Sequence, residues 1–306
     1  MAAQGGPPLE QMQPAEVRAQ RAQAAEAMAA LAGPIQEVAR VEDRSIPGPG
    51  QPIPVRVYWP AAASELPVLV YFHGGGWVFG NIDSVDRTCR ALANAAGCIV
   101  VNVEYRLAPE NKFPAAVDDA YAAVRYVSEH AAEFGADPGR IAVGGDSAGG
   151  NLAAVVCLMA RDRGGPRLAF QLLVYPVTDY DDDSPSQREF AEGYLLTRAA
   201  IPYFWGHYVS GPDQARHPHA SPMKAASLEG LPPAMVITAE CDPIRDQGEA
   251  YARRLQESGV PVTQRRYEGA IHVFFQMAGV LDSGKQAVAD AASALRRAFS
   301  HGAARA

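Results

Sequence analysis

The stretch Gly145-Asp-Ser-Ala-Gly149 decides the fold that we predict for this chain. It follows the apolar run Ile141–Gly144, which is typical of a buried strand, and it opens an alanine-rich segment that is typical of a helix. A serine on so sharp a turn needs small neighbours, because larger side chains would collide with adjacent backbone. The start of the helix then points amide donors at Ser147. Because the pattern also arises by chance, the rest of the chain has to support this interpretation.

Outward from this turn, short runs rich in Val, Ile and Tyr alternate with longer amphipathic or alanine-rich segments. This alternation predicts parallel strands that are joined by helices. The predicted strands are Val55–Trp59, Val68–Phe72, Ile99–Tyr105, Ile141–Gly144, Phe170–Tyr175, Met235–Ala239 and Val262–Tyr267. The predicted helices are Val85–Ala96, Ala115–Phe134, Ala148–Arg163, Ile244–Glu257 and Lys285–Phe299.

Two segments depart from this alternation. Residues 1–45 form an N-terminal arm, in which Pro14–Ala32 is rich in helix-favouring Ala, Gln, Glu and Arg. Residues 181–221 begin in Asp-rich turn material and continue as aromatic, helix-like sequence, as expected of an inserted cap. A single α/β catalytic domain then comprises residues 46–180 and 222–306, and a chain of 306 residues is long enough to give it a sizeable core.

Composition and charge exclude several classes of function. The 27 basic and 34 acidic residues give a net charge of −7, with no basic run that could follow a nucleic-acid backbone. The first ten residues lack the features of a signal peptide, and no apolar stretch is long enough to span a bilayer, so we expect a cytoplasmic protein that does not act at a membrane. The four cysteines are far apart and show no metal-binding spacing. The acidic run Asp179–Asp183 lacks the pattern of a calcium loop and is expected to be a solvated turn.

A second glycine-rich turn follows the predicted strand Val68–Phe72. It reads His73-Gly-Gly-Gly-Trp77, and three consecutive glycines allow bare backbone N–H groups to approach a substrate oxygen. By itself such a cluster is also typical of a flexible turn. Together with the serine turn about seventy residues later, it predicts an oxyanion-binding loop.

A serine hydroxyl needs a histidine base that is itself oriented by a carboxylate. Among the seven histidines, His272 and His301 are the two that leave room for an acid element after Ser147 and also lie beyond all the predicted strands but the last. We predict His272 as the base, because it follows the last strand in a loop whereas His301 lies in the C-terminal tail.

The predicted acid is Asp242, which directly follows the strand before that of the histidine. The ends of neighbouring parallel strands meet at one edge of the sheet, so both side chains should lie close together. Asp179 and Asp246 are the alternatives, although helix capping or surface charge suits them better. Asp146, beside the serine, is predicted to be a buried hydrogen-bonding support.

These motifs resemble those of the hormone-sensitive-lipase-like family of bacterial esterases over nearly the whole chain. The resemblance rests on four stretches in order, which are His73–Gly80, Tyr105–Glu110, Gly145–Asn151 and Asp242–Asp246. It implies an α/β-hydrolase fold, with a mostly parallel eight-stranded sheet between helices and a helical cap formed by the arm and the insertion.

The resemblance also implies roles for particular residues. The N–H groups of Gly74, Gly75 and Ala148 would form the oxyanion hole, and His73, Gly76 and Asp146 would support the loop. One residue departs from the family pattern, since Val273 stands where the family usually has glycine after the catalytic histidine. The loop is therefore expected to follow a slightly different path.

The predicted function is hydrolysis of short- to medium-chain carboxylic esters through an acyl-enzyme on Ser147, with no cofactor or metal. An amidase or deacetylase with the same triad stays open, since the first chemical step is shared. A nucleotide-binding enzyme lacks its glycine spacing here, and a non-catalytic binding homologue would not need the complete triad. A homodimer is left open as the assembly. Aromatic side chains could line a substrate pocket, although packing is the commoner role of such residues, and we name Trp77, Tyr194, Phe204 and Trp205.

Overall fold

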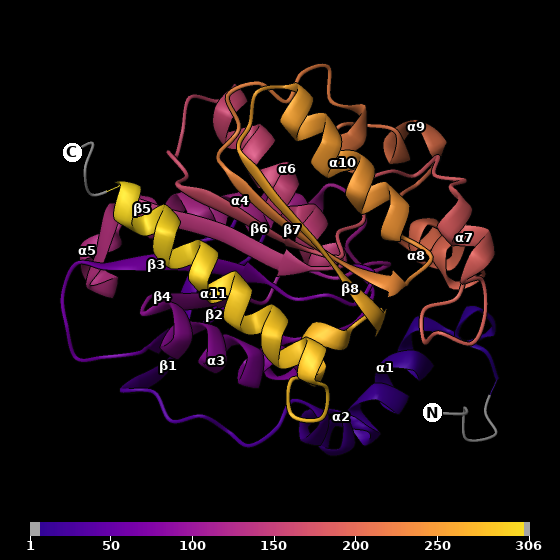
Figure 1. Cartoon of the computed structure of the whole chain (residues 1–306), viewed down its shortest axis with the longest axis horizontal. Coiled ribbons are helices and arrows are strands. Elements are labelled where there is room, and N and C mark those ends of the chain that lie inside the picture. The colour runs from indigo at the N-terminus through magenta and orange to yellow at the C-terminus, as the bar shows by residue number, and fades with distance from the viewer. Residues whose placement is uncertain (1–6, 303–306) are drawn as a thin grey trace.

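An eight-stranded sheet runs through the centre of the computed structural model, which describes residues 7–302 (Figure 1). The strand order is β1-β2-β4-β3-β5-β6-β7-β8. β2 pairs antiparallel with β1 and β4, and every other neighbouring pair is parallel, so the predicted mostly parallel eight-stranded sheet is confirmed. The strands are β1 (Arg40–Ile46), β2 (Ile53–Trp59), β3 (Leu66–Phe72), β4 (Ile99–Val103), β5 (Ala136–Asp146), β6 (Phe170–Val174), β7 (Ala234–Cys241) and β8 (Val262–Ile271).

Strand β1 is absent from the strands predicted by sequence, and it lies at the end of the range expected for the N-terminal arm. It pairs with β2 from Arg40 opposite Trp59 to Ile46 opposite Ile53. Its residues are mostly polar, and Ile46 alone is buried, because β1 is at the edge of the sheet. An edge strand therefore lacks the continuous apolar run by which the central strands are recognised.

The helices lie on both faces of the sheet. The predicted helix Ala115–Phe134 is divided, because His130 leaves the helical region with φ −119°. Within residues 7–302, no helix is both long enough and apolar enough to cross a membrane. The helices are α1 (Pro14–Gln23), α2 (Ala25–Leu31), α3 (Asp86–Ala96), α4 (Ala115–Glu129), α5 (Ala131–Phe134), α6 (Ala148–Asp162), α7 (Pro185–Glu189), α8 (Ala200–Tyr208), α9 (Pro212–Ala215), α10 (Arg245–Glu257) and α11 (Asp282–Gly302), with short 3₁₀ turns η1 (Leu9–Gln11), η2 (Ile82–Val85), η3 (Pro222–Lys224) and η4 (Phe274–Met277).

Alternate residues of the central strands build two separate cores. In β3, Val68, Val70 and Phe72 belong to the core that includes α4, α6 and α10. Leu69 and Tyr71 point to the opposite face and belong to the core under α3 and α11. Because side chains alternate along a strand, a continuous apolar run such as β3 has to be covered on both faces. The two layers hold the sheet rigidly between them, and the loops at its edge can carry a site.

The arm and the insertion lie near the carboxyl ends of the parallel strands (Figure 1). The arm contributes η1, α1 and α2, and the insertion contributes α7, α8 and α9. η1 packs against α8, so the two segments meet although they are far apart in the sequence. That these two segments form a cap stays a prediction.

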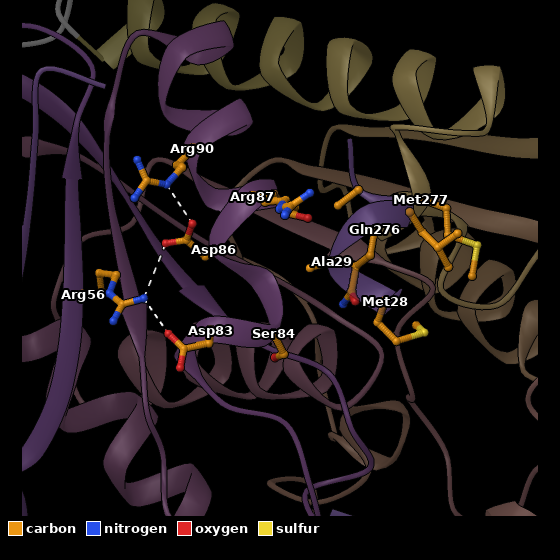
Figure 2. Close-up of a pocket in the computed structure, with 13 residues that line it drawn as sticks. Met28, Ala29, Arg56, Asp83, Ser84, Asp86, Arg87, Arg90, Gln276 and Met277 are labelled. Carbon is orange, nitrogen blue, oxygen red and sulfur yellow. Dashed lines mark hydrogen bonds and ion pairs between the residues drawn. The ribbon is translucent and has the colours of Figure 1, made fainter. Parts of the chain in front are cut away.

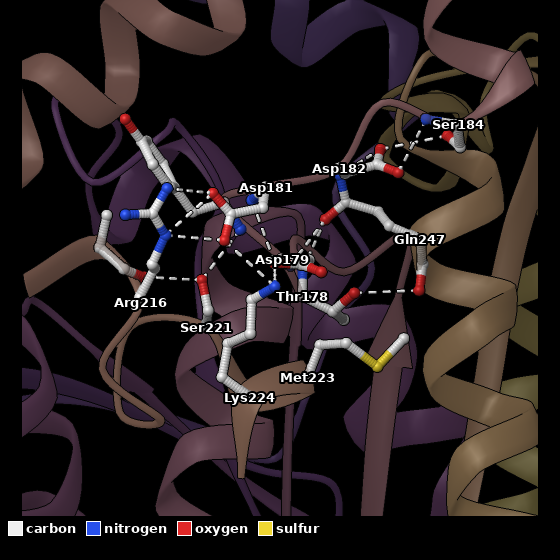
Figure 3. Close-up of polar contacts among 12 residues, drawn as sticks. Thr178, Asp179, Asp181, Asp182, Ser184, Arg216, Ser221, Met223, Lys224 and Gln247 are labelled. Atoms are coloured by element: carbon white, nitrogen blue, oxygen red, sulfur yellow. Dashed lines mark hydrogen bonds and ion pairs between the residues drawn. The ribbon is translucent and has the colours of Figure 1, made fainter. Parts of the chain in front are cut away.

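The acidic run that leads into the insertion is a turn with exposed Asp181 and Asp183, as expected, and its side chains are in addition paired with cations (Figure 3). Asp181 lies between two cations, 2.9 Å from Arg216 and 3.2 Å from Lys224. Lys224 also pairs with Asp179 at 3.1 Å. The hydrogen bond from Arg216 is the main reason why the pKa of Asp181 is lowered. The partners come from the end of the insertion and from the segment after it, and a sequence pattern does not reveal such a pairing.

Candidate active site

Ser147 lies on a strained turn between β5 and α6. Its backbone has φ 56° and ψ −118°, which is an unfavourable region for a residue with a side chain. A Cβ atom on Gly149 would overlap the carbonyl oxygen of Phe72, and a Cβ on Gly145 would overlap the backbone of Gly149. Glycine is therefore required on both sides of Ser147, as the motif predicted.

The structure brings together the three residues predicted for catalysis. Ser147 Oγ lies 3.0 Å from His272 Nε2, and His272 Nδ1 lies 2.7 Å from Asp242 Oδ2. Asp242 is fully buried and accepts a further hydrogen bond from the N–H of Ile244 at 3.0 Å, while His272 is 4% exposed. A carboxylate held in this way keeps the Nδ1–H tautomer of His272, which leaves Nε2 free to accept the proton of the serine.

The alternative acids have other partners. Asp246 accepts a hydrogen bond from the N–H of Ser186 at 2.9 Å and pairs with Arg245 at 2.8 Å. Asp179 pairs with Lys224. The structure therefore gives both aspartates the helix-end and surface roles that suited them better than catalysis.

Val273, the residue that departs from the family pattern, adopts the left-handed conformation with φ 75°. Glycine populates this region freely, whereas a β-branched residue is strained there. The loop after His272 thus has a backbone conformation that glycine would favour. Valine in place of the family's glycine therefore leaves the backbone at Val273 locally strained.

The glycine-rich loop is packed too closely for any side chain. A Cβ on Gly75 (φ 118°) would overlap the carbonyl oxygen of Phe79, and a Cβ on Gly76 (φ 60°) would overlap the ring of Phe204. A Cβ on Gly74 would lie 2.5 Å from Asp146 Oδ2. The backbone N–H groups of this loop can therefore come close to the carbonyl oxygen of a substrate that is bound next to Ser147.

One predicted oxyanion donor has to be reassigned. The N–H of Gly74 donates to Asp146 Oδ1 at 3.2 Å, so it is already engaged. Within residues 7–302, the N–H groups of Gly75, Gly76 and Ala148 donate to no protein acceptor. Gly76, which the sequence suggested only as loop support, therefore replaces Gly74 as a candidate donor. The glycine pattern could not decide this, because it depends on where the Asp146 carboxylate points.

Asp146 is a buried support that joins three segments. Its Oδ1 accepts from the Tyr71 hydroxyl at 2.9 Å as well as from Gly74, and its Oδ2 accepts from Gln276 Nε2 at 2.7 Å. Burial raises the pKa of Asp146 to about 6. Sequence reasoning missed Tyr71 and Gln276, because an apolar strand and a loop after the histidine give no signal of these contacts.

The His73 side chain supports the glycine-rich loop through a hydrogen bond to its backbone. Its Nδ1–H donates to the carbonyl oxygen of Gly74 at 2.7 Å, and its ring stacks on Tyr105 with centroids 4.3 Å apart. The Tyr105 hydroxyl donates to the carbonyl oxygen of His73 at 2.7 Å. Burial lowers the pKa of His73 to about 4, so this histidine is neutral at pH 7 and acts as structural support.

Two of the residues predicted for a substrate pocket are packed in the core. Trp77 stacks on Tyr208 with centroids 4.1 Å apart and lies 4.9 Å from Trp205, and both indoles are almost fully buried. Phe204 is half-buried beside Gly76, while Tyr194 packs against Phe190. Of the three predicted pocket residues outside the glycine-rich loop, Phe204 is the one whose ring lies against Gly76.

A cavity of about 310 Å³ lies between α2, α3 and η4 (Figure 2). Met28 and Met277 are on its apolar side, and its charged side chains pair with one another, as Arg90 does with Asp86. None of the predicted site residues lines it. Gln276 lies in its wall and donates to Asp146, so the cavity is close to the active site but separate from it.

The chain is similar to known hydrolases along most of its length. A family model described as the α/β-hydrolase fold matches residues 69–276. A carboxylesterase of Mycobacterium tuberculosis is 47% identical over 265 residues, which cover 85% of this chain and 83% of that protein. An ethyl acetate hydrolase of Pseudomonas putida is 38% identical over 284 residues, which cover 90% and 89% of the two chains.

Solved structures show the same relationship. A hyperthermophilic esterase of the archaeon Pyrobaculum calidifontis is 44% identical with a TM-score of 0.92, covering 97% of this chain and 94% of that one. A thermostable carboxylesterase from a metagenomic library is 43% identical with a TM-score of 0.90, covering 94% and 98%. The chain therefore belongs to the α/β-hydrolase family, and its resemblance to the hormone-sensitive-lipase-like esterases is confirmed.

Proposed function

We propose that this protein hydrolyses short- to medium-chain carboxylic esters through a covalent acyl-enzyme on Ser147. The observation that carries the proposal is the hydrogen-bonded series from Ser147 through His272 to Asp242, with distances of 3.0 and 2.7 Å. The names of the relatives support an ester substrate, and the ethyl acetate hydrolase among them supports a small one. An amide substrate is the second candidate, because the same first step would serve it.

The reaction has two stages. Ser147 Oγ attacks the ester carbonyl while His272 Nε2 accepts the serine proton, and the imidazolium then protonates the departing alcohol. In the second stage His272 takes a proton from water, which attacks the acyl carbon and releases the acid and the free serine. Asp242 keeps the imidazole oriented and stabilises its charged form.

The developing oxyanion would be bound by the N–H groups of Gly75, Gly76 and Ala148. Loss of one such donor costs about 3 kcal/mol of the barrier in comparable sites. The hydrogen bond from Gly74 to Asp146 supports this arrangement, since it ties the loop to the residue beside Ser147.

Hydrolysis of p-nitrophenyl butyrate by the purified protein and by two serine variants tests the proposal. We expect Ser147→Ala to lose about 10⁴-fold or more in kcat, because the nucleophile is gone. Ser210→Ala is the control, because Ser210 is exposed and outside the predicted site. Substantial turnover by Ser147→Ala would contradict the assignment of the nucleophile.

Substrate class is tested separately with esters of increasing acyl length and with an anilide matched to the best ester. We expect the highest kcat/KM for short and medium acyl chains and a much lower value for the anilide. A preference for the anilide would support the amidase alternative instead.

Cytoplasmic location is a further part of the proposal and comes from the sequence, whereas a homodimer stays open as the assembly. Cell fractionation tests the first, and sedimentation velocity of the purified chain tests the second. A single species of monomer mass at micromolar concentration would contradict the dimer.

A further inference from the structure

Tyr175, directly after β6, lies against the imidazole ring of His272. The two ring centroids are 4.6 Å apart and the planes are inclined by 52°. Tyr175 is 1% exposed, and its ring also lies near Phe274 with centroids 5.9 Å apart. The buried phenol ring of Tyr175 therefore packs against one side of His272, the proposed base.

The backbone around Tyr175 is bonded to the nucleophile on both sides. The N–H of Ser147 donates to the carbonyl oxygen of Val174 at 2.9 Å, and the N–H of Val177 donates to the carbonyl oxygen of Ser147 at 3.3 Å. The N–H of Tyr175 itself donates to Ile237 in β7, the strand that leads to Asp242, at 2.6 Å. The backbone of residues 174–177 is thus bonded to Ser147 and to strand β7. The Tyr175 side chain in this segment contacts His272.

Tyr175 has two features that are unfavourable in a folded protein. Its φ is +34°, although it carries a bulky side chain. Its hydroxyl is buried and has no hydrogen-bond partner among the residues that the structure describes. Burial, followed by the nearby carboxylates of Asp146 and Asp242, raises the pKa of the phenol well above its usual value, so the hydroxyl stays neutral. Unfavourable features of this kind persist where surrounding contacts fix a side chain, and they are frequent at functional sites.

We propose that Tyr175 is a positioning residue for the ester hydrolysis proposed above. Its ring restricts rotation of the His272 imidazole, so that Nδ1 faces Asp242 while Nε2 faces Ser147. The aromatic ring has this role, rather than the hydroxyl, because the hydroxyl bonds to no described residue. This inference rests on the proposed function, since it concerns the geometry of the same three residues.

The test compares Tyr175→Phe with Tyr175→Leu in hydrolysis of p-nitrophenyl butyrate. The phenylalanine variant keeps the ring, so we expect kcat within about twofold of the natural protein and an unchanged or higher melting temperature. The leucine variant frees one side of the imidazole, and we expect kcat to fall by about tenfold or more while KM stays within about twofold.

Tyr251→Leu is the matched control. Tyr251 in α10 is also fully buried, and its hydroxyl has no hydrogen-bond partner among the residues that the structure describes, but its ring does not pack against His272. We expect this variant to lose thermal stability without losing kcat, which separates a positioning effect from general loss of packing.

Three results would overturn the inference: kcat of Tyr175→Leu equal to that of the natural protein, an equal loss in Tyr251→Leu, or an equal loss in Tyr175→Phe. If the leucine variant does not fold, Tyr175→Met takes its place, because a flexible apolar side chain fills the volume without a rigid ring. Failure of the proposed function would be visible beforehand, as absence of ester turnover in the natural protein.

Discussion

At the scale of single residues, backbone strain is concentrated around Ser147, the proposed nucleophile. Trp77, Ser147, Tyr175 and Val273 all have positive φ although none is glycine. Trp77 ends the glycine-rich loop, and Ser147 is the proposed nucleophile. Tyr175 lies against His272, and Val273 directly follows it. Each such conformation costs on the order of 1–3 kcal/mol and persists only where neighbouring contacts hold it. The site is thus fixed in place before a substrate binds, at some cost in stability.

Val273 allows this strain to be measured. We expect Val273→Gly to raise the free energy of unfolding by about 1 kcal/mol, because glycine adopts φ 75° without a steric penalty. The value of kcat should stay nearly unchanged, since the backbone path is retained. Urea denaturation measures the free energy of unfolding, and the ester assay measures kcat. Val280→Gly is the control, because Val280 is exposed and not at positive φ, and it should lose stability. If Val273→Gly were less stable than the natural protein, packing of the Val273 side chain would stabilise the fold by more than the backbone strain destabilises it.

The stability of the protein should depend on the protonation of Asp146. Burial raises the pKa of Asp146 from its usual 3.8 to about 6, so folding favours the protonated form. Its contribution to stability is therefore fully present below pH 3.8 and is lost as the pH rises through 6. Relative to Asp146→Asn, which does not titrate, the natural protein should lose on the order of 2 kcal/mol between pH 4 and pH 7.

Urea denaturation of both proteins at several pH values measures this difference, and groups that titrate alike in the two proteins cancel. A difference that stays constant from pH 4 to pH 7 would contradict a raised pKa of Asp146. Asparagine has one acceptor oxygen where the carboxylate has two, so it cannot accept from Tyr71 and Gly74 at one atom and from Gln276 at the other, and we also expect kcat to be lower in Asp146→Asn.

At the scale of elements, the insertion is anchored to the catalytic domain through α10 (Figure 3). Gln247 is 3% exposed, and its Oε1 accepts from the N–H of Thr178 at 2.7 Å and of Asp179 at 3.1 Å. Its Nε2 donates to Asp182 Oδ2 at 3.1 Å, and the Thr178 hydroxyl donates to its backbone carbonyl at 2.9 Å. A single side chain therefore fixes the path of the chain as it enters the insertion.

We expect Gln247→Ala to lower the free energy of unfolding by about 1–3 kcal/mol, because buried N–H groups lose their acceptor. The same variant should expose the entry to the insertion, which limited proteolysis detects as faster cleavage near residues 179–184. Gln256→Ala is the control, since Gln256 lies on the exposed side of the same helix. Equal protease resistance of Gln247→Ala and the natural protein would contradict the anchoring role.

At the scale of the whole molecule, Arg18 joins the N-terminal arm to the catalytic domain. It donates to the carbonyl oxygens of Val78 at 2.8 Å and of Ala108 at 2.7 Å, and it pairs with Glu110. Val78 follows the glycine-rich loop, so the arm holds the far end of that loop. A guanidinium group can make these bonds at once because it offers several donors in one plane.

Two substitutions separate the carbonyl bonds from the ion pair. We expect Arg18→Met to cost about 1–3 kcal/mol, because partly buried carbonyl oxygens lose charged donors. Glu110→Gln should cost at most about 1 kcal/mol, because the Glu110 side chain is 58% exposed. Thermal denaturation compares the two variants. An equal loss in both would mean that the surface ion pair, rather than the carbonyl bonds, holds the arm.

The central strands, the serine turn and the three predicted catalytic residues could be identified from sequence because each has a local cause. Apolar runs mark buried strands, and glycine is required where any Cβ would overlap backbone, as at Gly149. Chain order places Asp242 and His272 after neighbouring strands. Edge strand β1 escaped prediction because it is exposed on the outside of the sheet.

The sequence alone was enough to predict the fold, the proposed nucleophile and the order of its partners, since these depend on periodicity and on small residues at fixed spacing. Which backbone N–H groups are engaged depends on three-dimensional contacts: the Asp146 carboxylate binds the N–H of Gly74, whereas those of Gly75 and Gly76 have no acceptor in the described part of the chain. The tertiary structure also decided that Trp77 is packed in the core and that Tyr175 lies against His272. These contacts join residues that are far apart in the chain, and no local pattern encodes the distance between them.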